Sequence, residues 1–270
     1  MIQRNVVRTI KNSTETTSKT NSPTQDTLAF NLTNTDAFYI GFQGPFAARY
    51  FEVPVVNATA NNVSVKFWDG TQWTNVQDLV DQTQGFTKSG FISWLNTGEW
   101  VPKKVTPVDD VALYWVKLTV DVGLDLATEL QACVNVFSDD DILNAYYPEL
   151  QSDSRFKPVD VDGSPLTTFL KQHLAAKDLV VLRLKQRKVI TDESQIIDVN
   201  SVASAAVHAA AWLIVNPIAT SDEMKALADR AKGLFDMEIN ELGKSADIDG
   251  DGVVTESEAA NITETVLVRR

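Results

Sequence analysis

The residue pattern of this chain changes at the run Ser138-Asp139-Asp140-Asp141, and that change constrains the fold more than any other feature. Between about residues 28 and 137, short runs rich in β-branched and aromatic residues alternate with turn dipeptides such as Asp69-Gly70, which is typical of antiparallel strands. The run is the predicted capped start of a short helix that ends before Pro148, and beyond it apolar residues recur at helical spacing. The pattern predicts an α+β multidomain protein, with an N-terminal antiparallel β-sandwich or jelly roll followed by an all-α helical domain.

Three segments are expected from this division. Residues 1–27 are rich in Thr, Ser and Asn and have little to bury, which predicts an extended or disordered arm after a short strand at residues 5–10. Residues 28–137 are predicted to form the β-sandwich domain. Residues 138–270 are predicted to form the helical domain, with four or five helices.

Two helices of the second domain are expected to define its core. Ser164-Pro165 is a cap followed by a proline at the first helical position, and it predicts a helical region over residues 166–187. Residues 202–215 are apolar nearly all round, so we expect them to form the buried centre of the bundle. This apolar run is interrupted by Ser204 and His208, and it is shorter than a membrane span.

An acidic loop near the C-terminus has the spacing of an EF-hand calcium loop. Alternate carboxylates, a glycine at the sharp turn, a backbone carbonyl and a final glutamate can together supply a hard cation with oxygen ligands. The loop lies between a long helix predicted over residues 221–242, begun by a Thr220–Glu223 capping box, and a short helix. The predicted ligands of a structural Ca²⁺ ion are Asp247, Asp249, Asp251, Val253 and Glu258.

Two other interpretations of the acidic loop remain open. Thr255 and Glu258 also have the spacing of a capping box, which explains Glu258 without a metal. An acidic turn between two helices can also be a solvated loop. A single loop of this kind fits a structural clip better than a calcium sensor, because sensor loops usually work in pairs.

Composition limits the classes of function. The net charge of −12 argues against general binding to nucleic-acid backbones, which needs clustered Lys and Arg. Cys133 is the one cysteine, so we expect no internal disulfide and synthesis in a reducing cytosol. Its position favours a strand residue over a nucleophile. The N-terminus lacks the apolar segment of a signal peptide, which predicts a soluble protein. His173 and His208 are the only histidines, and they stand in unrelated predicted helices, so no catalytic set is recognised and we expect no enzyme activity.

Five of the six tryptophans lie in the predicted β-sandwich. Aromatic side chains at these positions fit either a carbohydrate-binding surface or the core and rim of a sandwich, and the second interpretation is favoured because Trp94 and Trp115 lie within predicted strands. The five residues are Trp68, Trp73, Trp94, Trp100 and Trp115.

The β-rich segment resembles β-sandwich domains of phage tail and baseplate proteins. The resemblance rests on aromatic and glycine spacing over roughly 110 residues, in the runs IGFQGPFAARYFEV, FWDGTQWTNV, DQTQGFTKSGFISW, EWVP and LYWVKL. It implies a structural or host-facing module.

The helical segment resembles head–tail adaptor (connector) proteins of tailed bacteriophages. The resemblance covers residues 138–270 and rests on the order of SDDDILNAYYPEL, the helix LTTFLKQHLAAKDLVVLRLKQRKVI, an alanine-rich helix, a long helix, the acidic turn and the terminal Arg-Arg. It implies a structural virion protein that is assembled in the host cytoplasm and forms a twelve-subunit ring at the head–tail junction. The expected partners are the portal protein ring and tail or neck proteins, with genomic DNA only passing through the channel and no membrane. The implied portal-docking residues are Val266, Leu267, Val268, Arg269 and Arg270.

Other classes of function also fit parts of the sequence. The chain fits a tail, neck or baseplate attachment protein, or a calcium-stabilised carbohydrate-binding protein resembling a dockerin, although a dockerin needs two duplicated loops and only one is present. A hydrolase is disfavoured because no carboxylate lies in a recognisable catalytic motif.

Overall fold

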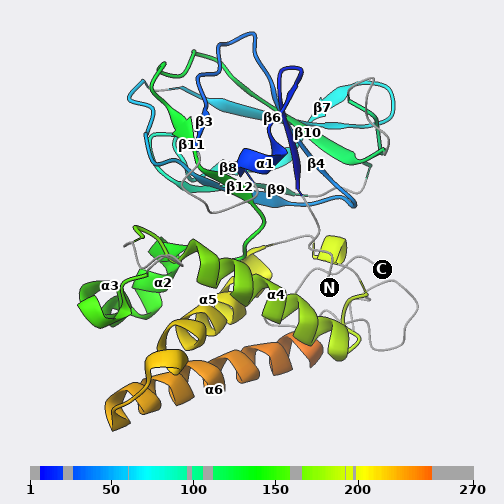
Figure 1. Cartoon of the computed structure of the whole chain (residues 1–270). Helices are drawn as coiled ribbons and strands as arrows, with labels where there is room; N and C mark the ends of the chain where they lie inside the picture. The colour runs from blue at the N-terminus through cyan, green and yellow to red at the C-terminus, as the bar shows by residue number, and fades with distance from the viewer. Residues whose placement is uncertain are drawn as a thin grey trace. The chain divides into compact units, whose positions relative to one another are not determined.

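A computed structural model of the chain shows antiparallel sheets in its N-terminal part and helices in its C-terminal part (Figure 1). The two parts are separate compact units, Met1–Asn135 and Val136–Arg270. The mixed α+β class predicted from the sequence is therefore confirmed. The structure describes residues 7–20, 27–59, 61–95, 99–105, 112–158, 166–191, 193–196 and 199–244.

The larger sheet of the first unit has six strands in the order β2-β1-β4-β10-β6-β7, and all its strand pairs are antiparallel. The strands are β1 (Arg8–Lys11), β2 (Thr14–Glu15), β4 (Phe38–Phe42), β6 (Val63–Trp68), β7 (Trp73–Asn75) and β10 (Tyr114–Val120). The hairpin between β6 and β7 turns at Asp69-Gly70, as predicted, and Gly70 adopts a φ of 102°, which glycine tolerates without strain.

The other strands form a four-stranded sheet in the order β12-β5-β9-β8 and a two-stranded sheet, β11-β3. Their bounds are β3 (Leu28–Ala29), β5 (Ala48–Glu52), β8 (Gln77–Asp81), β9 (Gly90–Leu95), β11 (Glu129–Leu130) and β12 (Ala132–Val134). Cys133 lies on β12 and is fully buried, as expected for a strand residue.

One hydrophobic core joins the sheets of the first unit. On β6, Val63, Val65 and Phe67 are buried while Ser64 and Lys66 are not, so alternate side chains point to opposite faces. The core continues through residues of all three sheets, among them Phe38, Ile40, Phe51, Ile92, Trp94, Val116, Leu118, Leu130 and Cys133. Of the five tryptophans predicted here, Trp94, Trp100 and Trp115 are buried and Trp68 and Trp73 are partly exposed.

The N-terminal segment contains a strand that overlaps the one predicted at residues 5–10, and it continues with short elements where an arm was predicted. Residues 8–11 form β1, which pairs along its length with β4, and a short helix, α1 (Thr17–Thr20), follows. The hydroxyl of Thr9 lies 3.0 Å from the Thr16 hydroxyl and 2.6 Å from the Thr20 hydroxyl, all three groups being buried. The segment was predicted to have little to bury, but these hydroxyl groups are buried and form hydrogen bonds with one another inside the fold.

The second unit is built around α5. Its helices are α2 (Asp140–Tyr146), α3 (Pro148–Ser152), α4 (Leu170–Gln186), α5 (Asn200–Val215) and α6 (Asp222–Lys244), with 3₁₀ turns η1 (Ser154–Phe156), η2 (Glu193–Gln195) and η3 (Asn216–Ile218). The N-terminal half of α5 packs with α4 and the end of α6, and its C-terminal half packs with α2, α3 and the start of α6 (Figure 1).

Alanines line α5 and are almost completely buried, among them Ala205, Ala206, Ala209, Ala210 and Ala211. Small side chains let the neighbouring helices approach closely on several sides, as predicted for the centre of the bundle. The stretch Asn200–Ile218 is long and apolar enough to cross a membrane by length and composition, a test that buried core helices also pass.

The long helix α6 begins one residue later than its predicted cap implied. The hydroxyl of Ser221, and not that of Thr220, accepts a hydrogen bond from the Met224 N–H at 3.3 Å. Ser ranks above Thr as an N-cap residue, but the capping-box spacing of Thr220 and Glu223 favoured the position one residue earlier.

Candidate functional site: a buried polar network at the start of the helical unit

The acidic run at residues 139–141 begins the helical unit by capping α2. Asp139 is extended, and its Oδ1 accepts a hydrogen bond from the Ile142 N–H at 2.9 Å. Burial raises the pKa of Asp139; the hydrogen bond from Ile142 and the proximity of His173 lower it, whereas Asp141 and Asp140 raise it further. Asp139 therefore satisfies an orphan helix N–H although ionisation costs free energy at this position.

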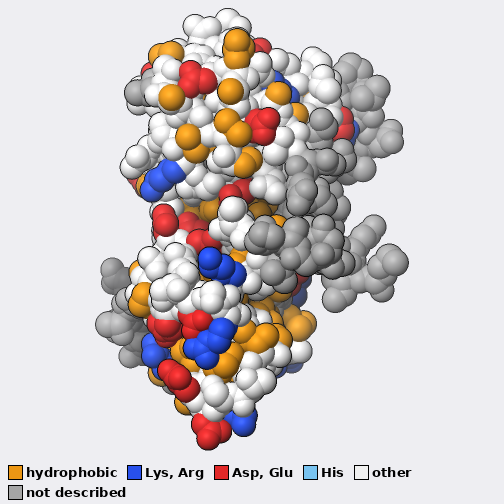
Figure 2. Space-filling model, turned by 60° about the vertical axis from the view of Figure 1, so that its left-hand side comes forward, with side chains coloured by type: hydrophobic (Ala, Val, Ile, Leu, Met, Phe, Trp, Pro, Cys, Tyr) orange, Lys and Arg blue, Asp and Glu red, His pale blue; other side chains and the backbone are white. Residues whose placement is uncertain are grey.

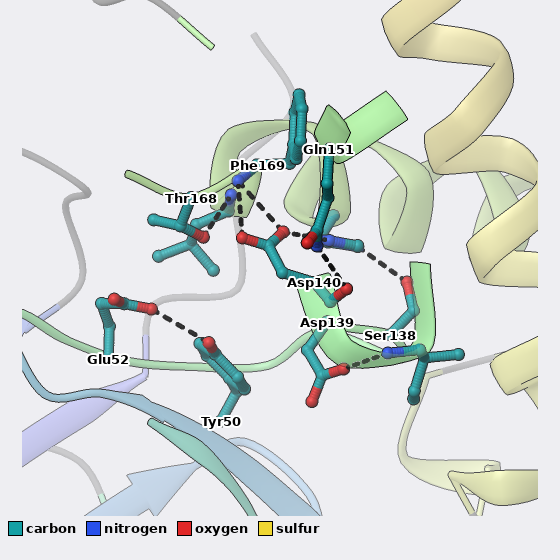
Figure 3. A network of polar contacts seen from close by, with 11 residues as sticks. Tyr50, Glu52, Ser138, Asp139, Asp140, Gln151, Thr168 and Phe169 are labelled. Atoms are coloured by element: carbon teal, nitrogen blue, oxygen red, sulfur yellow. Dashed lines mark hydrogen bonds and ion pairs between the residues drawn. The ribbon is translucent and has the colours of Figure 1, made fainter. Parts of the chain in front are cut away.

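The carboxylate of Asp140 caps a different helix. It accepts hydrogen bonds from the Phe169 N–H, at 3.1 Å to Oδ1 and 3.2 Å to Oδ2, just before α4 begins (Figure 3). Its Oδ1 is also 3.0 Å from Nε2 of His173, in the second turn of α4. A negative charge at this end of a helix complements the helix dipole, and α4 has no side-chain cap of its own at Phe169.

His173 links Asp140 to Ser138. Its Nδ1 lies 2.9 Å from the Ser138 hydroxyl, and Ser138 and His173 are 0% and 1% exposed. With Asp140 ionised, Nε2–H donates to the carboxylate and, in the neutral ring, Nδ1 accepts from the serine. The network is completed by Gln151, whose side-chain amide donates to the backbone carbonyl of Asp140 at 2.7 Å (Figure 3).

The order serine, histidine, aspartate is that of a hydrolytic triad, but the surroundings differ. A nucleophilic serine must meet a substrate carbonyl, and Ser138 has no exposed surface in this structure. Its hydroxyl also meets Nδ1, and the carboxylate meets Nε2, the reverse of the usual ring orientation. The geometry supports holding α2 and α4 together rather than acyl transfer.

The second histidine holds the same segment to α5. Nδ1 of His208 is 2.8 Å from the Tyr147 hydroxyl, at the junction of α2 and α3, and the two rings meet edge to face. The guanidinium of Arg230, on α6, lies 5.3 Å from the centre of the Tyr147 ring. Burial raises the pKa of Tyr147 to about 12, so its hydroxyl stays protonated at neutral pH.

The sequence identified Ser138 to Asp141 as a helix start but did not predict this network. Ser138 and His173 are 35 residues apart, and no spacing rule relates them. One signal was present in the sequence. Three aspartates follow Ser138, whereas a single helix start needs only one capping side chain, so another aspartate was free to cap a different helix.

The predicted calcium ligands and portal-docking residues, within 247–258 and 266–270, lie outside the described residues. Within the described part of the chain, no group of three or more His, Cys, Asp or Glu side chains could hold a metal ion. No protein-family model and no curated protein matches the chain.

Proposed function

We propose that the chain is a structural virion protein, a non-catalytic head–tail adaptor whose ring joins the portal to the tail or neck. The observation that carries the proposal is the order of helices around α5: a capped short pair, α2 and α3, then α4, then the alanine-rich α5, then the long α6. This is the order on which the resemblance to head–tail connector proteins rests.

The polar network supports a mechanical role. A subunit that links a capsid to a tail has to keep its shape under load, and hydrogen-bond networks between packed elements favour one rigid arrangement. Asp140 and the two histidines join α2 and α3 to both α4 and α5 in this way.

Exposed apolar side chains support assembly with other subunits. Figure 2 shows hydrophobic side chains spread over the displayed face of the β-rich unit. Leu126 is 86% exposed, and Val55 and Val56 are exposed on a neighbouring loop. The Asp125 carboxylate joins these loops by accepting from the Ala58 N–H and the Thr59 hydroxyl. Apolar surface of this kind is typical of contacts between chains.

The finer parts of the proposal concern the C-terminal end of the helical unit and the sheets. A Ca²⁺ ion held by Asp247, Asp249, Asp251, Val253 and Glu258 fixes the angle between the last two helices, in an EF-hand-like loop. Val266 to Arg270 dock on the portal. The β-rich unit is a jelly-roll-like sandwich that projects outward as a decoration or attachment surface.

Electron microscopy of virions with gold-labelled antibody against the protein tests the proposal. Label confined to the head–tail junction is the expected result, together with closed rings of the purified protein in negative stain. Label at the tail tip or on fibres would replace the adaptor role by attachment. Absence of the protein from particles would overturn the virion role altogether.

A further inference from the structure

The outward face of β4, β10, β6 and β7 differs in charge from the rest of the chain. These four adjacent strands contain Lys66 and Lys117 and no Asp or Glu, although the chain carries 36 acidic residues and a net charge of −12. The strand register sets Lys117 directly opposite both Lys66 on β6 and Tyr39 on β4. These side chains therefore share one face of the sheet, opposite to the buried Val65 and Leu118.

Aromatic rings cover the same face. Trp68 and Trp73 are cross-strand partners whose ring centroids are 5.6 Å apart, and the Tyr39 ring lies 5.6 Å from Trp73. Tyr39 and Trp73 belong to strands with β10 and β6 between them, so their rings reach across the sheet. Tyr39, Trp68 and Trp73 are all partly exposed, and together they make a continuous aromatic strip.

A third lysine lies against this strip. Nζ of Lys103 is 3.3 Å from the centre of the Trp68 ring and 5.5 Å from that of Trp73. The Lys103 carbonyl accepts a hydrogen bond from Nε1 of the buried Trp115 at 2.8 Å, which fixes the backbone that carries this ammonium group. The fold therefore fixes the backbone of Lys103, from which the side chain extends over the Trp68 ring.

These cations have no anionic partner in the described part of the chain. Neither Lys66, Lys103 nor Lys117 forms an ion pair there. The neighbouring carboxylate of Asp69 instead accepts hydrogen bonds from Thr71, Gln72 and Thr74. Lys66 and Lys117 are directly opposite each other on adjacent strands, and like charges in this arrangement repel each other. An anion bound to this face would reduce that repulsion in the folded chain.

We propose that this face, defined by Tyr39, Lys66, Trp68, Trp73, Lys103 and Lys117, binds an acidic polysaccharide. Partly exposed aromatic rings offer flat apolar surfaces to the C–H faces of sugar rings, and lysines pair with sugar carboxylates. Ser64, Asn75 and Thr119 lie beside them, where hydroxyl and amide groups can bond sugar hydroxyls.

Nucleic acid fits this face less well. A strand with one charge on every phosphate is repelled by the acidic remainder of the chain, and three lysines release few counterions. An acidic polysaccharide instead presents the C–H faces of successive sugar rings to the aromatic strip, with its carboxylates beside the lysines. Binding of an acidic polysaccharide to this face does not require the adaptor role.

Titration calorimetry of the full chain with an oligogalacturonate, a neutral maltooligosaccharide and a single-stranded oligonucleotide tests the proposal. We expect binding of the acidic oligosaccharide that weakens as salt is raised, because the lysines are solvent-accessible. Trp73→Ala should weaken binding by roughly tenfold or more, as expected for an aromatic contact. Lys66→Gln and Lys117→Gln should each weaken it severalfold.

Lys88→Gln is the matched control, because Lys88 is exposed in a turn away from these four strands. It should bind the acidic oligosaccharide like the unchanged protein, and circular dichroism should show that all variants are folded. No binding of the acidic oligosaccharide, an equal loss in Lys88→Gln, or tighter binding of the neutral sugar or the oligonucleotide would overturn the proposal.

Discussion

At the scale of single residues, Asp140 is a side chain that joins two elements of the helical unit. It belongs to α2, yet its carboxylate satisfies the Phe169 N–H at the start of α4 and the Nε2–H of His173. An interaction of this kind between two elements fixes both their distance and their orientation.

Asp140→Ala should lower the free energy of unfolding of the helical unit by roughly 1–3 kcal/mol, because it leaves two donors without an acceptor. Asp141→Ala is the matched control: Asp141 is exposed in the same helical turn, and its loss should cost about 0.5 kcal/mol or less. Urea unfolding followed by far-UV circular dichroism measures both. Equal effects of the two substitutions would show that Asp140 contributes only its charge near the start of α2.

His208 should make the helical unit sensitive to acid. Burial, and secondarily the positive charge of Arg230, lower the pKa of His208 from its usual value. The unfolded chain therefore binds this proton more readily, so the stabilisation is complete above the unfolded pKa of about 6.5 and is lost as the pH falls through 6.5 toward the lower, folded pKa. Between about pH 8 and about pH 5.5, the free energy of unfolding should fall more in the unchanged protein than in His208→Gln. A parallel fall in both proteins would assign the acid sensitivity to other groups.

These residue contacts mark the limit of prediction from sequence. Local features were predictable, such as the capped helix start at residues 138–141 and the Asp69-Gly70 turn, because each depends on a few neighbouring residues. The partners of Asp140 and His208 were not predictable. They are 29 to 61 residues away in the sequence, and the packing of the helices brings them together. The calcium ligands stay a prediction.

At the scale of elements, the small side chains of α5 set how closely the helices approach. Ala209 is fully buried where α5 meets its neighbours, whereas Ala226 is exposed in the interior of α6. Interiors packed to this degree cannot take up added volume without moving a backbone.

Ala209→Leu should therefore destabilise the helical unit by roughly 1–3 kcal/mol through overpacking. Ala226→Leu adds the same atoms to a solvated helix face and should change stability by less than about 0.5 kcal/mol. Thermal and urea unfolding of both variants provide the comparison. A tolerated Ala209→Leu would mean that the packing around α5 is looser than the structure indicates.

The element boundaries depend partly on contacts between residues that are far apart in the sequence, and the sequence pattern does not reveal these contacts. The region predicted over residues 166–187 contains α4, which begins at Leu170, and the Asp140 carboxylate accepts a hydrogen bond from the Phe169 N–H just before it. The predicted cap at Ser164-Pro165 lies outside the described residues. A short strand was predicted at residues 5–10 and overlaps β1, but the place of β1 beside β4 depends on a partner about 30 residues away. Periodicity predicts the type of an element better than its partner.

At the scale of the whole molecule, the chain has two units with separate hydrophobic cores, and these are expected to respond separately to perturbation. Five of the six tryptophans belong to the β-rich unit, so their fluorescence reports mainly on it. Far-UV ellipticity reports mainly on the helices.

The proposed calcium clip should stabilise only the helical unit. If the loop binds Ca²⁺, a concentration one hundred times Kd adds about 2.7 kcal/mol to the free energy of unfolding, and chelation removes it. The ellipticity transition should then shift to lower temperature with chelator, while the fluorescence transition stays in place. The double variant Asp247→Asn, Glu258→Gln should no longer respond. An unchanged ellipticity transition, with no metal found by mass spectrometry, would leave the capping-box interpretation of Glu258.

The scarcity of histidine gives the helical unit two internal spectroscopic probes. The chain has only His173 and His208, and each imidazole joins the α2–α3 segment to a different long helix. A nuclear magnetic resonance spectrum with labelled histidine should therefore contain just two sets of ring signals, one for each attachment. Loosening of either attachment during the proposed ring assembly, or on contact with a partner, would be visible as a change in one set alone.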